Sequence, residues 1–185
     1  MPRRTLGRTG LLVPEVSFGC GPVSGLLTGT DAPLQLATVK RALDAGIDWF
    51  DTAAGYGNGT SESNLGRALK ELGAAPRIAT KVRIPENGFD RIEECVRESV
   101  RGSLARLGVG SLALLQLHNG ITRNRGEEPA SITPADAIAV FETFRKLRVD
   151  GIVAFFGLTG TGQPEPLREV VPPGCSTRSR CRSTG

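Results

Sequence analysis

Short apolar runs alternate with helical patterns along most of this 185-residue chain, and this alternation constrains the fold more than any other feature. Five runs have the length and apolar character of buried strands. They cover residues 15–19, 47–51, 77–82, 112–118 and 152–158. Strands that are separated by helices pair in parallel, with the helices outside the sheet. The alternation therefore predicts a parallel α/β fold.

The four helical patterns between these runs have recognisable ends. A short polar residue or an acidic residue stands near each start, and a glycine follows each last turn, where the backbone favours a left-handed conformation. The fourth pattern also has proline in its first turn, at Pro134, after the expected cap Thr133. The expected helices run between these pairs of residues: Asp31 and Gly46, Ser61 (as the N-cap) and Gly73, Asp90 and Gly108, and Thr133 and Gly151.

Two architectures fit a repeated strand–helix pattern, namely a doubly wound sheet and a (β/α)8 barrel. A doubly wound dinucleotide fold would place G-x-G-x-x-G after the first strand, but residues 19–25 miss that spacing and contain Pro22. Residues 4–16 read as a small hairpin, which would cap the bottom of a barrel. We therefore predict a (β/α)8 barrel with an N-terminal hairpin. A whole barrel needs about 250 residues, so residues 1–171 are expected to form about five β/α units of an incomplete one.

The charge distribution bears on partners and location. Residues 172–185 have no apolar periodicity and carry three arginines, so we expect a disordered basic tail. The remaining residues hold 20 basic and 19 acidic side chains, which is too even for a nucleic-acid-binding face. An apolar run of membrane-spanning length is absent from the sequence, as is a signal-peptide pattern at its start. The sequence predicts a cytoplasmic protein with neither a membrane nor a nucleic-acid partner.

Cysteine and histidine usage predicts that the protein has no metal site. The spacings of the four cysteines do not match a zinc motif, and one histidine is too few to complete the usual ligand set. Reduced thiols are the expected state. The cysteines are Cys20, Cys95, Cys175 and Cys181.

Polar residues interrupt three consecutive apolar strands at their carboxyl ends, where the active sites of parallel α/β folds gather. They are Asp51, Lys81 and His118, and Tyr56 follows Asp51 in the next loop. Each has an ordinary structural explanation when it is taken alone: a turn former, a solvated cation, a hydrogen-bonded core histidine or a packed ring. Their joint placement predicts a site. Tyr56 and His118 are also the only tyrosine and the only histidine.

The motifs around these residues resemble those of the aldo-keto reductase family. Asp51 to Gly57 reads D-T-A-A-G-Y-G, similar to the family signature D-T-A-x-x-Y-G, and Ser61 to Gly66 resembles the S-E-x-x-L-G that follows. Residues 78–82 and 114–118 resemble the family's lysine and histidine strands. The resemblance extends from about residue 3 to residue 171.

The resemblance implies a nicotinamide-dependent reduction of aldehydes or ketones to alcohols. Tyr56 would be the general acid, with Lys81 and Asp51 as its electrostatic partners and His118 orienting the carbonyl oxygen. NADP(H) is the implied cofactor, and the sequence leaves NAD(H) open as the alternative. The residues that match the family's contacts to the nicotinamide end are Cys20, Gly21, Asp51, Thr159 and Gly160.

The partner implied is a small carbonyl or alcohol substrate, whose identity the sequence does not specify. A catalytically inactive fragment, or a non-enzymatic binding module on the same scaffold, is the alternative function. An incomplete barrel would also have unpaired strand edges, and self-association through these edges is the expectation that follows.

Overall fold

The computed structural model describes residues 1–171, and the predicted tail at 172–185 lies outside the described residues. The strands are β1 (Arg3–Thr5), β2 (Leu12–Pro14), β3 (Phe18–Gly19), β4 (Trp49–Asp51), β5 (Arg77–Val82), β6 (Leu112–Leu117) and β7 (Val153–Leu158). The α-helices are α1 (Ala32–Asp44), α2 (Thr60–Leu72), α3 (Ile92–Leu107), α4 (Pro134–Val149) and α5 (Pro164–Val170). Short 3-10 helices cover Gly7–Thr9, Pro22–Ser24 and Glu86–Gly88.

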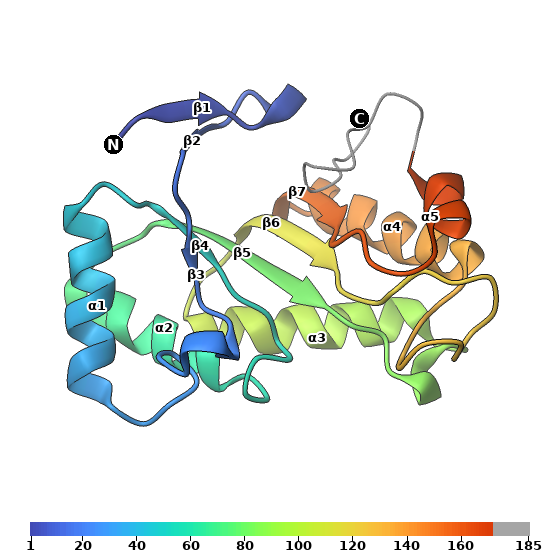
Figure 1. Ribbon diagram of the computed structural model, residues 1–185, viewed down its shortest axis with the longest axis horizontal. Helices are drawn as coiled ribbons and strands as arrows, with labels where there is room; N and C mark the ends of the chain where they lie inside the picture. Colours follow the sequence, from blue (N-terminus) through green and yellow to red (C-terminus); the bar gives the residue numbers. More distant parts are fainter. Residues whose placement is uncertain (172–185) are drawn as a thin grey trace.

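The predicted barrel architecture is confirmed as an open, parallel part of a barrel. Strands β3 to β7 form one five-stranded sheet in sequence order, and every neighbouring pair is parallel. Strands β1 and β2 form a separate antiparallel hairpin, with Arg3 paired to Pro14. Figure 1 shows the helices arranged along one side of the sheet and the hairpin at the other side.

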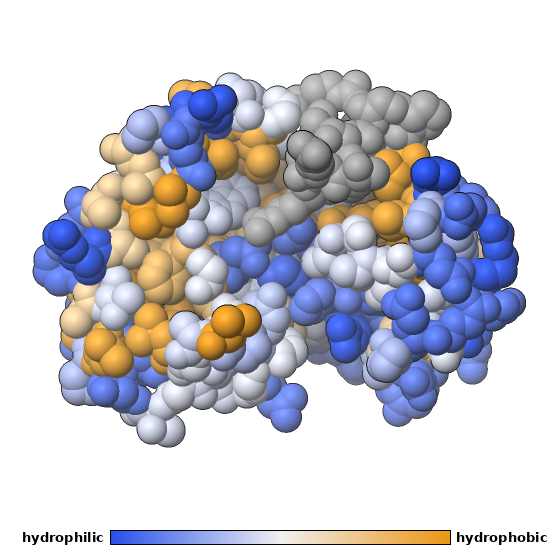
Figure 2. Space-filling view, viewed as in Figure 1, coloured by the Kyte–Doolittle hydropathy of each residue, from blue (hydrophilic) through white to orange (hydrophobic). Residues whose placement is uncertain are grey.

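The sheet has two faces with different cores, because successive side chains of a strand point to opposite faces. The larger core lies between the sheet and the helices and includes Phe50, Leu115 and Phe156. On the other face a small cluster of Trp49, Ala79 and Leu114 packs against hairpin residues. Figure 2 shows apolar side chains gathered on the side of the hairpin and α1, and hydrophilic side chains on the side of α5 and the loop before α4.

Local chemistry explains most of the helix ends. The Asp31 side chain accepts a hydrogen bond from the backbone N–H of Leu34, as its expected position near the start of α1 requires. Thr133 and Asp136 form a reciprocal capping box at the start of α4. Gly73 and Gly108 follow α2 and α3 in the left-handed conformation, as predicted.

The prediction that Ser61 caps α2 is wrong. The helix begins at Thr60 with Gly59 as its N-cap, and no side chain caps it. The Ser61 hydroxyl is used for tertiary contacts instead, because it donates to the carbonyl of Cys20 at 2.8 Å and lies 3.0 Å from the hydroxyl of Thr52. Long-range bonds between α2 and the strand ends have replaced the local cap.

Some element boundaries also differ from the prediction. The first and second strands are shorter than expected, and His118 lies just beyond β6. The sequence analysis assigned no helix after β7, where the structure has α5. This helix has seven residues with Pro164 in its first turn, so it is too short to show apolar periodicity.

Candidate active site

Lys81 organises a buried polar group at the carboxyl end of the sheet. Its ammonium donates to Asp51 Oδ1 at 2.5 Å, to the backbone carbonyl of Thr52 at 2.8 Å and to the Tyr56 hydroxyl at 3.2 Å. Lys81 and Asp51 are 6% and 7% exposed, so neither charge is fully solvated. An ammonium carries three N–H donors, and this one has a partner for each. Asp51 and Thr52 therefore hold the cation in place beside the phenol.

Tyr56 and His118 lie next to each other on the open side of this group. Their ring centroids are 5.9 Å apart with an edge-on angle of 80°, and the Lys81 ammonium lies 4.7 Å from the centre of the tyrosine ring. The structure therefore brings together the four residues that the sequence placed at neighbouring strand ends. Tyr56 comes from the loop before α2, whereas the other three come from β4, β5 and the end of β6.

The protonation of His118 follows from its surroundings. Burial, the Lys81 ammonium and the Arg83 guanidinium lower the pKa of His118 to about 4, and Asp51 opposes this shift only in part. The imidazole is therefore neutral near pH 7. A neutral imidazole can donate one hydrogen bond to a substrate oxygen, but it is not the acid that protonates it.

Apart from Asp51 in β4, the residues expected at the nicotinamide end directly follow the two outer strands of the sheet, β3 and β7. Cys20 is 1% exposed, its N–H donates to the Asp51 carbonyl, and its own carbonyl accepts from Ser61. Burial, followed by the nearby Asp51, raises the pKa of the Cys20 thiol to about 12, so the thiol is protonated and unreactive.

The other expected cofactor residues lie close to the site. A Cβ added to Gly21 would lie 3.7 Å from the Tyr56 ring, in ordinary van der Waals contact, so glycine keeps a side chain away from the phenol. Across the sheet, Thr159 donates backbone and side-chain hydrogen bonds to the Leu117 carbonyl at 3.0 and 3.2 Å. Gly160 follows with φ +70°, a conformation that favours glycine. The cofactor contacts of these residues stay a prediction.

Sequence reasoning missed a second buried ion pair, on the helix-facing side of the sheet. Glu62 is 0% exposed; it accepts from Thr80 Oγ1 at 2.5 Å and from Arg106 Nε at 2.8 Å. Thus Glu62 links α2 to β5 and α3. Gly66 supports the same contact, because a Cβ there would lie 2.5 Å from the Arg106 carbonyl oxygen. The S-E-x-x-L-G motif therefore packs α2 below the site.

Asn119, directly after His118, was also missed. Its side chain accepts from the N–H of Ile84 at 2.8 Å and donates to the carbonyls of Ile84 and Ala130 at 2.9 and 2.6 Å. It is 2% exposed. These bonds tie together the segments that follow β5 and β6. The available sequence signal was a polar residue at the end of an apolar strand.

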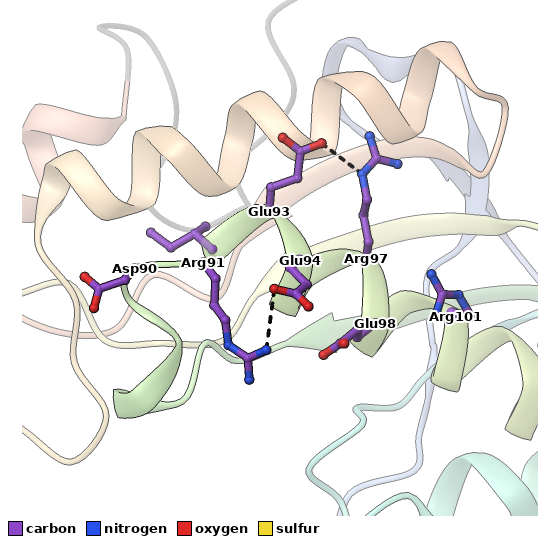
Figure 3. Close-up of a pocket in the computed structure, with 8 residues that line it drawn as sticks. Asp90, Arg91, Glu93, Glu94, Arg97, Glu98 and Arg101 are labelled. Atoms are coloured by element: carbon purple, nitrogen blue, oxygen red, sulfur yellow. Dashed lines mark hydrogen bonds and ion pairs between the residues drawn. The ribbon is translucent and has the colours of Figure 1, made fainter.

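A hollow at the start of α3 lies away from these residues. Figure 3 shows that charged side chains surround it and that some of them pair with each other. Glu93 accepts from Arg97 at 2.9 Å, and it also pairs with Lys146 of α4 at 2.6 Å. Arg91 and Glu94 pair at 3.5 Å. These pairs are solvated and contribute little to the stability of the fold.

Within residues 1–171 no group of three or more His, Cys, Asp or Glu side chains is placed to hold a metal ion. The helices of this region include none that is long and apolar enough to cross a bilayer.

Comparisons with known proteins identify the family of the chain. The aldo/keto reductase family model matches residues 15–180. L-galactose dehydrogenase of Arabidopsis thaliana is 35% identical over 161 residues, which cover 85% of this chain and 48% of that protein. Pyridoxal 4-dehydrogenase of Microbacterium luteolum is 39% identical over 199 residues, which cover 91% of this chain and 58% of that protein. The chain spans about half the length of these relatives.

Solved structures show the same relationship. The aldo-keto reductase of Bacillus halodurans in its holo form superposes with a TM-score of 0.67 at 31% identity, covering 85% of this chain and 50% of that one. The matched family model, the relatives and the shared fold confirm the resemblance seen in the motifs. The chain belongs to the aldo/keto reductase family.

Proposed function

We propose that the site carries out NADP(H)-dependent reduction of an aldehyde or ketone to an alcohol, with Tyr56 as the general acid. The observation that carries this proposal is the bond from the Lys81 ammonium to the Tyr56 hydroxyl, with the same ammonium bound to Asp51. Oxidoreductases among the relatives support the reaction class. NAD(H) is the alternative cofactor.

The proton comes from Tyr56 in the proposed reaction. As the phenol gives its proton to the developing alkoxide, a negative charge forms on the phenol oxygen, 3.2 Å from the Lys81 ammonium. Asp51 and the Thr52 carbonyl keep that ammonium in position before the reaction begins. A charge fixed in a poorly solvated site stabilises the transition state without reorganising.

His118 orients the carbonyl group. Its neutral ring stands edge-on to Tyr56, so one substrate oxygen can accept a hydrogen bond from both the phenol and the imidazole. The low pKa of His118 keeps this donor uncharged near pH 7. This division of roles assigns proton transfer to Tyr56 and positioning to His118.

The residues present fit the nicotinamide end of the cofactor. When bound, the nicotinamide supplies the hydride. Gly21 lies beside the Tyr56 ring, and Thr159 and Gly160 directly follow β7, across the sheet. We propose these three residues as its contacts, with the Cys20 backbone, already bonded to Asp51 and Ser61, holding Gly21 in place.

The proposal includes a small carbonyl or alcohol substrate and a cytoplasmic location. The expectation that nucleic acid is not a partner stays a prediction, as does self-association through β3 and β7.

Two measurements on the chain test the function. The first is NADPH affinity by fluorescence titration, and the second is NADPH oxidation with 4-nitrobenzaldehyde, followed by absorbance. Saturable binding with turnover that Tyr56→Phe abolishes is the expected result. Binding without turnover would favour the inactive-fragment alternative, and turnover that survives Tyr56→Phe would contradict the role of the phenol.

A further inference from the structure

Arg83 directly follows β5 at the carboxyl end of the sheet, where the four polar residues lie; we call this edge the mouth of the site. Lys81 pairs with Gln116 across β5 and β6, and Val82 pairs with Leu117. The N–H of His118 donates to the Val82 carbonyl at 2.8 Å, which continues this ladder by one residue. Arg83 is therefore level with His118. Arg83 comes two residues after Lys81 and directly follows β5, and its charge acts on the imidazole of His118.

The charges around His118 leave the Arg83 guanidinium without a counter-ion. Three charged groups act on the imidazole, namely Lys81, Arg83 and Asp51. Asp51 already pairs with Lys81 at 2.5 Å. Among residues 1–171 the structure shows neither a hydrogen bond nor an ion pair to the exposed Arg83 side chain. The mouth of the site is thus locally cationic.

Exposed arginines fall into two groups, since some have acidic partners and others, such as Arg101, have none among the described residues; Arg83 differs from the second group in lying level with His118. Arg91, Arg97 and Arg123 are exposed or partly exposed, and each has an acidic partner, at 3.5, 2.9 and 2.7 Å. Arg83 stands level with His118, which would orient the substrate in the proposed reaction. An anion can bind this guanidinium without first displacing an acidic side chain from it.

We propose that Arg83 is a specificity residue that binds a carboxylate on the substrate, so that the site prefers carbonyl compounds with an anionic group over neutral ones. This inference rests on the proposed function for its use in catalysis, but the anion site can be measured without turnover. A planar guanidinium binds a carboxylate through two parallel N–H donors. His118 would orient the carbonyl oxygen while Arg83 held the carboxylate.

His118 provides a direct reporter, because it is the only histidine in the chain. The experiment follows the imidazole NMR signals of His118 in the whole chain during titration with benzoate, and separately with benzamide as the neutral analogue of the same shape. Benzoate is expected to bind more tightly than benzamide. Arg83→Gln should raise the Kd for benzoate about tenfold and leave benzamide within about twofold.

Matched variants distinguish a specific contact from a general loss of charge. Arg101→Gln removes an exposed arginine on α3, away from the site, and should leave both titrations unchanged (Figure 3). Arg83→Lys keeps the charge without the planar fork and should give an intermediate Kd. Equal effects of Arg83→Gln and Arg101→Gln, or equal binding of benzoate and benzamide, would overturn the proposal.

A phosphate of the cofactor is the other anion that Arg83 could meet. NADPH titration separates the two sources: Arg83→Gln should leave the NADPH Kd within about twofold. A weaker NADPH affinity with unchanged benzoate binding would assign Arg83 to the cofactor and overturn the substrate role. Absence of aldehyde reduction would contradict the proposed function but would leave the benzoate result standing. The two failures are therefore distinguishable.

Where turnover is measured, the same contact predicts a substrate preference. The ratio of kcat/KM for 4-carboxybenzaldehyde to that for 4-nitrobenzaldehyde should fall about tenfold in Arg83→Gln. The nitro compound is intrinsically the more reactive aldehyde, but this difference is the same for both proteins and cancels when the ratio in the variant is divided by the ratio in the wild type. An unchanged ratio in a variant with wild-type thermal stability would contradict the assignment of Arg83.

Discussion

Two buried ion pairs lie on opposite faces of strand β5, and adjacent residues of that strand serve them. Lys81 points to the open face and pairs with Asp51, whereas Thr80 points to the helices and donates to Glu62, the partner of Arg106. In the Glu62 network both carboxylate oxygens have bonds within the protein. In the Lys81 network the last member is the Tyr56 hydroxyl, which faces the site.

The last member of each network distinguishes a structural ion pair from a candidate catalytic one. Both carboxylates are buried, and both pairs join segments that are far apart in the sequence, so burial of the carboxylate alone does not distinguish them. The Glu62 network ends in bonds between helices and strand, and the Lys81 network ends in a group that can exchange a proton. Changes to the first should therefore lower stability, and changes to Tyr56 should lower activity alone.

Tyr56→Phe is expected to have the largest effect. Loss of the proton donor should lower kcat/KM for carbonyl reduction about 10²–10⁴-fold. The free energy of unfolding should change by less than about 1 kcal/mol, because the variant loses one hydrogen bond and little volume. Steady-state kinetics and urea unfolding of the same preparations check both parts. A large loss of stability would place Tyr56 among the structural residues and remove the contrast.

Glu62→Ala should destabilise the protein by about 2–4 kcal/mol. It removes the shared acceptor of Thr80 and Arg106; the partial exposure of Arg106 keeps the cost toward the lower end. Urea unfolding measures it. Glu94→Ala, which breaks an exposed pair with Arg91, is the control and should cost less than about 1 kcal/mol. Similar losses in the two variants would show that the Glu62 pair is not special.

His118 makes stability depend on pH. The unfolded chain takes up its proton near pH 6.5, and the folded protein takes it up only near pH 4. Between these values the unfolded state binds more protons, so stability falls as the pH falls. We expect a loss of about 1–2 kcal/mol, because solvent screens the half-buried ring.

The free energy of unfolding is measured from pH 7 to pH 4 for the wild type and for His118→Gln. The loss of stability that His118 causes should be absent from the variant. NMR titration of the single histidine gives its pKa directly. An imidazole that titrates near its ordinary value would contradict both the linkage and the assignment of a neutral donor.

Gln116→Met should have the smallest effect, and it should raise the free energy of unfolding where the other changes lower stability or activity. Gln116 is 1% exposed and lies beside Lys81 in the sheet, and its side-chain atoms have no hydrogen-bond partner among the described residues. A buried amide without partners is destabilising, so Gln116→Met should raise the free energy of unfolding by about 1 kcal/mol. Urea unfolding checks it; a clear loss of stability would show that the amide has a partner in solution.

Much of the fold could be predicted because its signals are local. Apolar periodicity and helix-ending glycines such as Gly73 and Gly108 identified four helices, and the alternation with strands predicted the parallel sheet. The helix α5 was not predicted, because seven residues are too few for a periodic pattern. Ser61 was misassigned because a local rule treats it as a cap, and its actual partners, Cys20 and Thr52, directly follow β3 and β4.

The sequence by itself determined which residues stand at the strand ends, since Asp51, Lys81 and His118 each follow a buried apolar run. It could not determine how their charges are balanced. Lys81 finds Asp51 30 residues away and Glu62 finds Arg106 44 residues away, so both pairings depend on strand register and helix packing. The tertiary structure alone decided which pair is closed off by the helices, and that Arg83 stands level with His118 without a partner in the described chain, because these relations exist only after distant segments pack together.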